Sequence, residues 1–232
     1  MDGSGALSLT IVDALDKLDK PAWDAVANPP DAPFDPFLSW DFLQALEESG
    51  CVGAHTGWQP AHLAARDAQG ALMGAMPLYA KDHSYGEYVF DHSWADAMRR
   101  AGGRYYPKLQ CAVPFTPVPG RRILARDPQV VSALAQGAIA LAQRAEASSV
   151  HITFAQQALC DELKPLGYLT RAGLQYHWFN QGYRSFDDFL AALASQKRKN
   201  VRRERAKALE IAQVKRLRGA DIKPRDWDFF FR

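Results

Sequence analysis

The chain has 232 residues, 47% of them hydrophobic and 23% charged, a composition that excludes a disordered protein and suffices for one large domain or two small ones. No stretch reaches the roughly 20 apolar residues of a membrane-spanning helix. The start, MDGSGALSLTIVDALDK, lacks a basic segment and a continuous apolar run, so we expect no signal peptide. Three widely separated cysteines, Cys51, Cys111 and Cys160, argue against a disulfide framework or zinc site and indicate reduced thiols in a cytoplasmic protein.

The first half of the chain is expected to combine strands with short helices. Alternating apolar and polar residues predict strands, and apolar residues spaced three and four apart predict helices. These patterns predict, in chain order, a strand at 7–11, helices over 20–27 and 37–49, and strands over 59–66 and 71–80. The last two strands flank the turn DAQG, which is typical of a hairpin.

The second half carries one strong helix-start signal. Asp127 can cap a helix whose first residue is Pro128, and apolar residues continue the pattern to about Ala145. Around this helix the sequence predicts strands over 108–113 and 150–154, a helix over 156–164, and strands over 168–171 and 174–180. This order predicts a mixed α/β fold.

From Phe186 the pattern changes to apolar residues three and four apart, which predicts one long projecting helix over 186–211. A strand over 213–218 is expected after it. The chain then ends in IKPRDWDFFFR, where Pro224 and Asp226 are typical of a helix start. Since a native chain seldom ends one turn into an apolar helix, we expect this sequence to be a fragment of a longer chain.

The segment SQKRKNVRRERAK, residues 195–207, concentrates the positive charge. It holds seven Lys or Arg against one acid, Glu204, whereas the whole chain has a net charge of only +2. Such a segment needs an anionic partner, an acidic neighbouring surface or plain solvation.

Several stretches resemble the FemAB-like proteins, a branch of the GNAT acyltransferase superfamily associated with peptidoglycan biosynthesis or recognition. The stretches are PFLSWDFLQALEESG, GWQPAHL, HSYGEYVFDHSWADA, GGRYYPKLQCAVPFTPVPGRR and KRKNVRRERAK. The run over 108–180 is also similar to the GNAT core of strand, loop, long helix, strand, helix and strands. The resemblance implies a GNAT-like mixed sheet flanked by helices, followed by a long basic helical arm.

The resemblance further implies a bacterial, cytoplasmic transferase that forms an amide bond on an amine, with a peptidoglycan precursor as a candidate acceptor. We expect a first GNAT-like domain at 1–184, a basic arm at 185–212 and the start of a truncated second domain at 213–232. The remainder of that C-terminal domain would be a partner of this part. No tightly bound cofactor or metal is expected, and the acyl donor is aminoacyl-tRNA or acyl-CoA. The alternatives are an acetyl-CoA-dependent N-acetyltransferase and a non-catalytic module that recognises a cell-wall precursor or tRNA.

The basic segment is a candidate anion-binding or tRNA-binding site. On a helix its charges form two adjacent faces that could follow a phosphate backbone or bind a phosphate-bearing precursor. The alternative is a solvated arm, or one paired with acids of a missing domain. The candidate residues are Lys197, Arg198, Lys199, Arg202, Arg203 and Arg205.

The loop PVPGRRILA is a candidate site for the pyrophosphate of coenzyme A. It lies between a strand and a capped helix, and Gly120, Arg121 and Arg122 would supply backbone and guanidinium donors. It carries only one of the small residues of the GNAT motif Q/R-x-x-G-x-G/A. The alternative is a structural turn from strand to helix.

The segment GEYVFDHSWADA holds the candidate catalytic residues Asp91 and His92, with Glu87 nearby. A carboxylate beside a histidine could act as a general base for an attacking amine. The alternative is local capping, with Asp91 or Ser93 starting a helix. In YYPKL, the side chains of Tyr105, Tyr106 and Lys108 could line the same cleft or contribute to the core.

Overall fold

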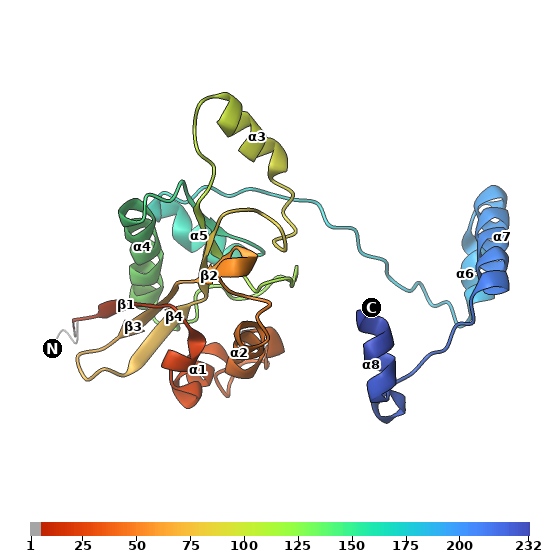
Figure 1. Cartoon of the computed structure of the whole chain (residues 1–232), viewed down its shortest axis with the longest axis horizontal. Helices are drawn as coiled ribbons and strands as arrows, with labels where there is room; N and C mark the ends of the chain where they lie inside the picture. The colour runs from red at the N-terminus through yellow and green to blue at the C-terminus, as the bar shows by residue number, and fades with distance from the viewer. Residues whose placement is uncertain (1–5) are drawn as a thin grey trace. The chain divides into compact units, whose positions relative to one another are not determined.

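The computed structural model describes residues 6–232, so residues 1–5 of the expected first domain lie outside it (Figure 1). The chain divides into two compact units, Met1–Gly173 and Leu174–Arg232. The expected domain limits at 184 and 212 stay a prediction. Among the described residues, no helix has the length and apolar character needed to cross a membrane.

The first unit contains strands interleaved with helices. Its strands are β1 (Ser8–Val12), β2 (Trp58–Pro60), β3 (His62–Arg66), β4 (Leu72–Met76), β5 (Leu78–Lys81), β6 (Lys108–Cys111) and β7 (Val150–Ile152). Its α-helices are α1 (Lys20–Ala27), α2 (Trp40–Glu48), α3 (His92–Arg100), α4 (Pro128–Arg144) and α5 (Gln157–Leu163). The expected mixed α/β architecture is confirmed.

The strands form two sheets, with the orders β1-β3-β4 and β2-β5-β6-β7. All neighbours are antiparallel except β6 and β7, which pair in parallel with α4 between them in the chain. The order β6, α4, β7 is the strand–helix–strand arrangement that the resemblance implies.

The predicted hairpin is present but bent. The predicted strands 59–66 and 71–80 each form two strands, because the chain passes from one sheet to the other at Ala61 and Pro77. Pro77 has no N–H and cannot donate to a strand ladder, which accounts for the break on its side. The Ala61 N–H still donates to the Leu78 carbonyl at 2.8 Å, so the two halves stay connected.

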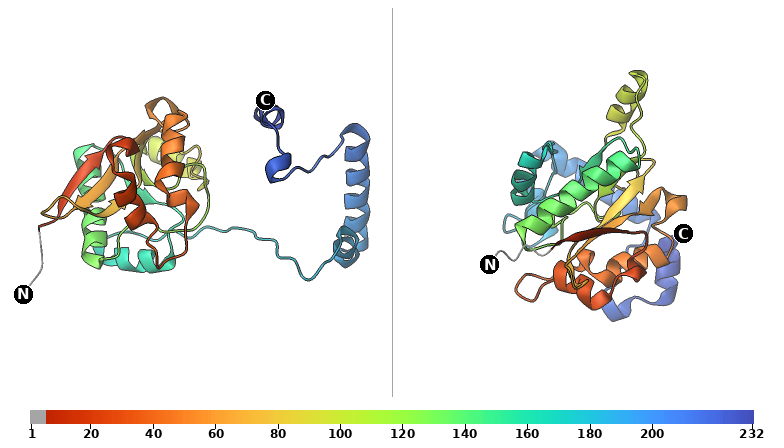
Figure 2. Two further views of the ribbon diagram at one scale, coloured as in Figure 1. Left: turned by 90° about the horizontal axis from the view of Figure 1, so that it is seen from below. Right: turned by 90° about the vertical axis from the view of Figure 1, so that its left-hand side faces the viewer.

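Helices cover both sides of the strands: α4 lies on one side, and α1 and α2 on the other (Figure 2). Alternation along β3 accounts for this, since Leu63 and Ala65 face the core beneath α4 and Ala64 faces the core beneath α1 and α2. The start of α4 is as predicted, because the Asp127 carboxylate accepts from the Gln129 N–H at 2.8 Å.

The second unit contains α6 (Phe186–Ala192), α7 (Ser195–Ile211) and α8 (Pro224–Phe231). The predicted single helix over 186–211 is wrong, because the backbone is extended at Leu193 and Ala194, with ψ of 148° and 144°. The Arg198 guanidinium donates to the Ala191 carbonyl at 3.0 Å, which satisfies a carbonyl that the end of α6 leaves open.

The predicted strands over 168–171, 174–180 and 213–218 are also wrong. These segments have no regular secondary structure and pair with no described strand. Their apolar side chains are largely exposed, with Leu169 at 96% and Tyr176 at 91%. Apolar alternation is therefore not sufficient to form a strand where no partner strand is present.

Candidate functional site

A group of buried charged side chains lies where β6 meets the segment 82–91. The Lys108 ammonium donates to Glu87 Oε2 at 2.7 Å, to Asp91 Oδ2 at 2.8 Å and to Ser84 Oγ at 2.8 Å. The Tyr105 hydroxyl donates to the same Asp91 oxygen at 2.7 Å. Lys108, Glu87 and Asp91 are each at most 2% exposed. These five residues form what we term the Lys108 cluster.

Strand pairing and the following segment position the cluster. β5 and β6 are antiparallel with Lys81 opposite Lys108, and the chain leaves β5 to form segment 82–91 before entering α3. Within this segment Glu87 and Asp91 turn inward and the aromatic side chains turn outward, the reverse of the usual partition, while Asp82 at its start is exposed. The exposed members are Tyr85 at 70%, Tyr88 at 49% and Phe90 at 76%.

The cluster has one ammonium group for two carboxylates, and it leaves two carboxylate oxygens without a donor. Glu87 Oε1 and Asp91 Oδ1 are buried and accept no hydrogen bond from the described residues. Buried acceptors without a partner are costly, so such oxygens mark a place where a donor can bind. The two oxygens fit a hydrogen-bond donor such as an amine.

The two carboxyl groups differ in their pKa. Burial raises the pKa of Glu87, although the Lys108 charge acts in the opposite direction. Burial also acts to raise the pKa of Asp91, but hydrogen bonds from Lys108 and Tyr105 outweigh it and hold that pKa well below its usual range. Asp91 is therefore ionised at neutral pH, while Glu87 takes up a proton more readily than an ordinary glutamate.

Lys81 and His151 lie next to the cluster. The Lys81 ammonium sits 3.6 Å from the centroid of the Trp58 ring, and burial lowers its pKa to about 8 despite the nearby Glu87 charge. The His151 ring on β7 packs edge-on to Tyr105. Burial and the Lys108 charge lower the pKa of His151 to about 4, so this imidazole is neutral at pH 7.

The two predicted catalytic residues face different ways. Asp91 is buried against Lys108, whereas His92 is exposed, with its ring centroid 5.6 Å from that of Tyr85. No hydrogen bond or ion pair joins their side chains within residues 6–232. Asp91 does precede the first residue of α3, but its side chain makes no capping bond because Lys108 and Tyr105 engage it.

The expectation that YYPKL lines the same region is confirmed for Tyr105 and Lys108, which bond directly to Asp91. Tyr106 lies one bond further out, since its hydroxyl is 2.8 Å from Ser84 Oγ. Sequence reasoning missed Ser84, Lys81 and His151. The available signal was a lysine at one end of each strand, Lys81 at the end of β5 and Lys108 at the start of β6, but the register that places them opposite each other could not be read from the sequence.

The predicted pyrophosphate loop directs its donors at the protein itself. The Gly120 N–H donates to the Phe154 carbonyl at 3.1 Å. The Arg121 guanidinium donates to two carbonyls at the end of α1. Arg122 is 2% exposed and donates to three backbone carbonyls, among them that of Thr153 at 2.8 Å. These bonds fasten the loop between α1 and the end of β7.

The start of α4 is occupied in the same way. Pro128 has no N–H to offer, and the Asp127 carboxylate takes the Gln129 N–H. An acid at this position also disfavours an incoming phosphate, because it opposes the positive end of the helix dipole.

The predicted anion-binding side chains lie along α7, which has no buried residue. Arg198 and Arg202 reach α6, the latter at 3.9 Å from Asp187, and the Arg205 guanidinium lies 4.7 Å from the centroid of the Phe186 ring. No acid lies within ion-pair distance of the remaining three in the described part of the chain: Lys197, Lys199 and Arg203.

A metal site has no evident ligands, since no three His, Cys, Asp or Glu side chains gather suitably among residues 6–232.

Comparisons with known proteins give one family. The FemAB-like family model, described as peptidoglycan biosynthesis/recognition, matches residues 14–232. Among solved structures, the chain is similar to the crystal structure of the aminoglycoside antibiotic 6'-N-acetyltransferase AAC(6')-Ih from Acinetobacter baumannii. The two share 12% identity with a TM-score of 0.42, over 76% of this chain and 100% of that chain. No curated protein matches the chain in sequence.

Proposed function

Because the chain belongs to the FemAB-like family of peptidoglycan biosynthesis and recognition proteins, we propose that it is an acyltransferase that forms an amide bond on an amine of a peptidoglycan precursor. The acceptor amine binds at the Lys108 cluster, and the acyl group comes from aminoacyl-tRNA in the cytoplasm. The observation that supports this is the pair of buried oxygens without a donor, Glu87 Oε1 and Asp91 Oδ1.

Glu87 is the proposed general base. As the acceptor nitrogen attacks the acyl carbonyl carbon, it gives up a proton to Glu87 Oε1. The ester bond to the tRNA then breaks, and the proton passes from Glu87 to the departing ribose oxygen, so the tRNA leaves with a free hydroxyl and Glu87 is ionised again. Lys108 holds the other Glu87 oxygen in place, and ionised Asp91 orients the amine through Oδ1. The raised pKa of Glu87 brings it closer to the working pH than an ordinary glutamate. Since both oxygens are buried, segment 82–91 must open when the acceptor binds.

Two surfaces favour aminoacyl-tRNA over acyl-CoA as the acyl donor. At the start of α4, the N–H groups that a coenzyme A pyrophosphate would need already donate hydrogen bonds to backbone carbonyls and to Asp127. On α7, Lys199 and Arg203 have no acidic partner among the described residues and are available to phosphates. We expect the double substitution Lys199→Glu and Arg203→Glu to weaken tRNA binding and lower its salt dependence, since each lost phosphate contact reduces the logarithmic salt slope by about 0.9.

A transfer assay tests the proposal. The full chain is incubated with a precursor stem peptide that carries a free amine, together with either aminoacyl-tRNA or acetyl-CoA. The mass of the peptide is then measured by mass spectrometry. The proposal expects a gain of one aminoacyl residue from the tRNA donor. A gain of an acetyl group supports the N-acetyltransferase alternative. Binding of the peptide without transfer from either donor supports the recognition module and contradicts the enzyme.

A further inference from the structure

Exposed aromatic side chains gather on α3 and on the segment that leads into it. α3 has no buried residue and stands away from the sheets in two perpendicular views (Figures 1 and 2). Trp94 and Met98 on α3 are 60% and 44% exposed, and they follow the three exposed aromatics of segment 82–91. The aromatic face, as we term it, consists of Tyr85, Tyr88, Phe90, Trp94 and Met98.

The backbone is strained where it presents the aromatic face to solvent. Tyr88 and Phe90 have left-handed backbones, with φ of 59° and 51°, which are strained for aromatic residues. Glu87, directly before Tyr88, and Asp91, directly after Phe90, are buried against Lys108. A segment that buries two of its three acids and exposes its aromatic side chains gains little stability from the hydrophobic effect, so the exposed side chains require a partner to account for the arrangement.

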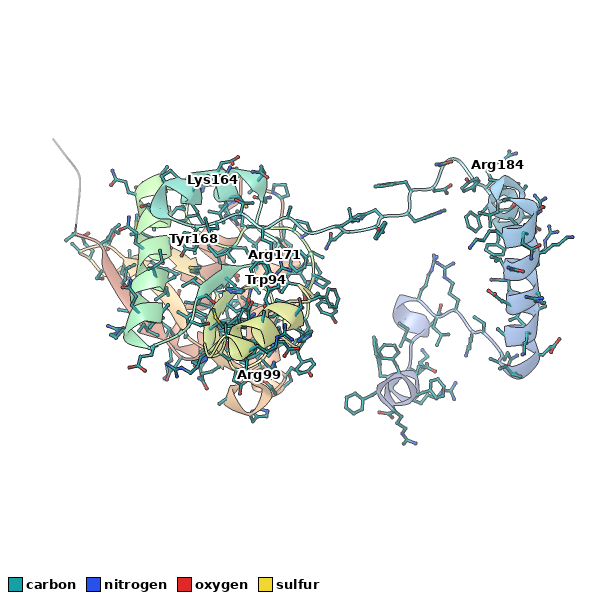
Figure 3. The ribbon with its side chains drawn as sticks, turned by 90° about the horizontal axis from the view of Figure 1, so that it is seen from above. Trp94, Arg99, Lys164, Tyr168, Arg171 and Arg184 are labelled. Atoms are coloured by element: carbon teal, nitrogen blue, oxygen red, sulfur yellow. The ribbon has the colours of Figure 1, made fainter. Side chains whose placement is uncertain are left out.

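Positive charge accompanies the aromatic face. Arg99 and Arg100 end α3, and the Arg171 guanidinium lies 5.2 Å from the Trp94 ring centroid. Figure 3 labels Arg171, Trp94 and Arg99 in this region. Arg104 follows α3, 3.9 Å from Glu146. Asp96, the exposed acid of α3, is paired with Arg99 at 2.6 Å. The balance of exposed charge around the face is positive.

We propose that this face docks on the headgroup region of an anionic phospholipid bilayer. Trp and Tyr side chains prefer the membrane–water interface, where the ring is buried and its polar atom stays hydrated. Arginines among them complement anionic headgroups. The aromatic face projects as a short helix with a loop, a shape that can insert among lipid headgroups. A protein partner would need a surface of complementary shape that packs against it. The proposal is independent of the transfer reaction and would bring the protein to lipid-anchored acceptors.

Vesicle flotation tests the aromatic contribution. The full chain is mixed with vesicles of phosphatidylcholine containing 30% phosphatidylglycerol, or of phosphatidylcholine alone. We expect binding to the anionic vesicles and an at least about tenfold loss in the double variant Phe90→Ser and Trp94→Ser, a modest fraction of what full burial of two aromatics would give. The matched control is Phe229→Ser and Phe231→Ser on α8, which removes two side chains that are 83% and 93% exposed and should change binding less than twofold.

A second pair of variants tests the charge. Arg99→Glu with Arg100→Glu should lower binding to anionic vesicles at least about tenfold, because each basic residue near such a surface contributes several-fold. Arg216→Glu with Arg218→Glu, on two exposed residues outside the basic segment 195–207, makes the same change in net charge and should have little effect. Circular dichroism and the urea midpoint show whether each variant is folded.

Four results would overturn the proposal. They are absence of binding to anionic vesicles, equal binding to neutral vesicles, equal losses in the α8 control or the Arg216 and Arg218 control, and a dimer in gel filtration that the Phe90→Ser and Trp94→Ser variant abolishes while vesicle binding is unchanged.

Discussion

Removing the Lys108 charge should destabilise the first unit strongly. Lys108→Met keeps most of the side-chain volume but leaves Glu87 and Asp91 buried without a cation. Breaking a buried ion pair in this way typically costs about 3–5 kcal/mol, a large part of the roughly 5–15 kcal/mol that holds a domain folded. Urea unfolding followed by tryptophan fluorescence measures the change, since four of the six tryptophans lie in the first unit: Trp23, Trp40, Trp58 and Trp94.

The pH dependence distinguishes this cause from a packing defect. In the wild type, the lowered pKa of Asp91 contributes stability above its ordinary value of 3.8, and this contribution is lost as the pH falls through the lowered pKa. In the variant, burial raises both carboxyl pKa values, so the folded state takes up protons first. The gap between wild type and variant should therefore narrow as the pH falls from 7 to 5.

The matched control is Lys17→Met, which removes an exposed ion pair to Asp13 and should leave the unfolding free energy unchanged within error. Equal effects of Lys108→Met and Lys17→Met, or a gap that is the same at pH 7 and pH 5, would refute the reasoning.

Three further predictions concern other parts of the chain. Asp127→Ala removes the cap of α4 and should lower the unfolding free energy by about 1 kcal/mol in urea titrations, while Asp127→Asn should keep most of it. Lys81 has a pKa lowered to about 8 from 10.5, so between these values the unfolded chain binds a proton that the folded one lacks; stability should rise with pH across this window, and less so in Lys81→Met. Cys51 is exposed and should react with a thiol reagent in the native protein, whereas Cys111, whose pKa burial raises to about 12, should react only on unfolding, and equal rates would contradict its burial.

Local chemistry made much of the first unit predictable. Asp127 and Pro128 predicted the start of α4, and the turn DAQG predicted a hairpin, because caps and turns depend on residues that are close together in the sequence. The bend of that hairpin at Ala61 and Pro77 was not predictable in the same way, since it depends on which sheet each half joins. The predicted strands over 168–171 and 174–180 did not form for a related reason: a strand needs a partner strand, and alternation of apolar residues does not supply one.

Most members of the candidate site were predictable from the sequence, but Ser84 and the geometry of the site were not. Glu87, Asp91 and the YYPKL segment were recognised from their chemistry, and the structure joins them through Lys108. Asp91 does not pair with His92 because its carboxylate accepts hydrogen bonds from Lys108 and Tyr105 instead. A charge-assisted hydrogen bond to a buried ammonium is stronger than the bond of a helix cap. Adjacent residues on a chain often face opposite ways, so sequence proximity was a poor guide here.

The most direct test of the proposed function is the rate of transfer in Glu87→Gln. The substitution keeps the shape of the side chain and removes its capacity to take a proton, so we expect kcat to fall by about 10²–10⁴ with KM for the acceptor changed much less. Glu146→Gln, on an exposed acid, is the control and should be indistinguishable from wild type. Folded Glu87→Gln protein that transfers at the wild-type rate would contradict the account.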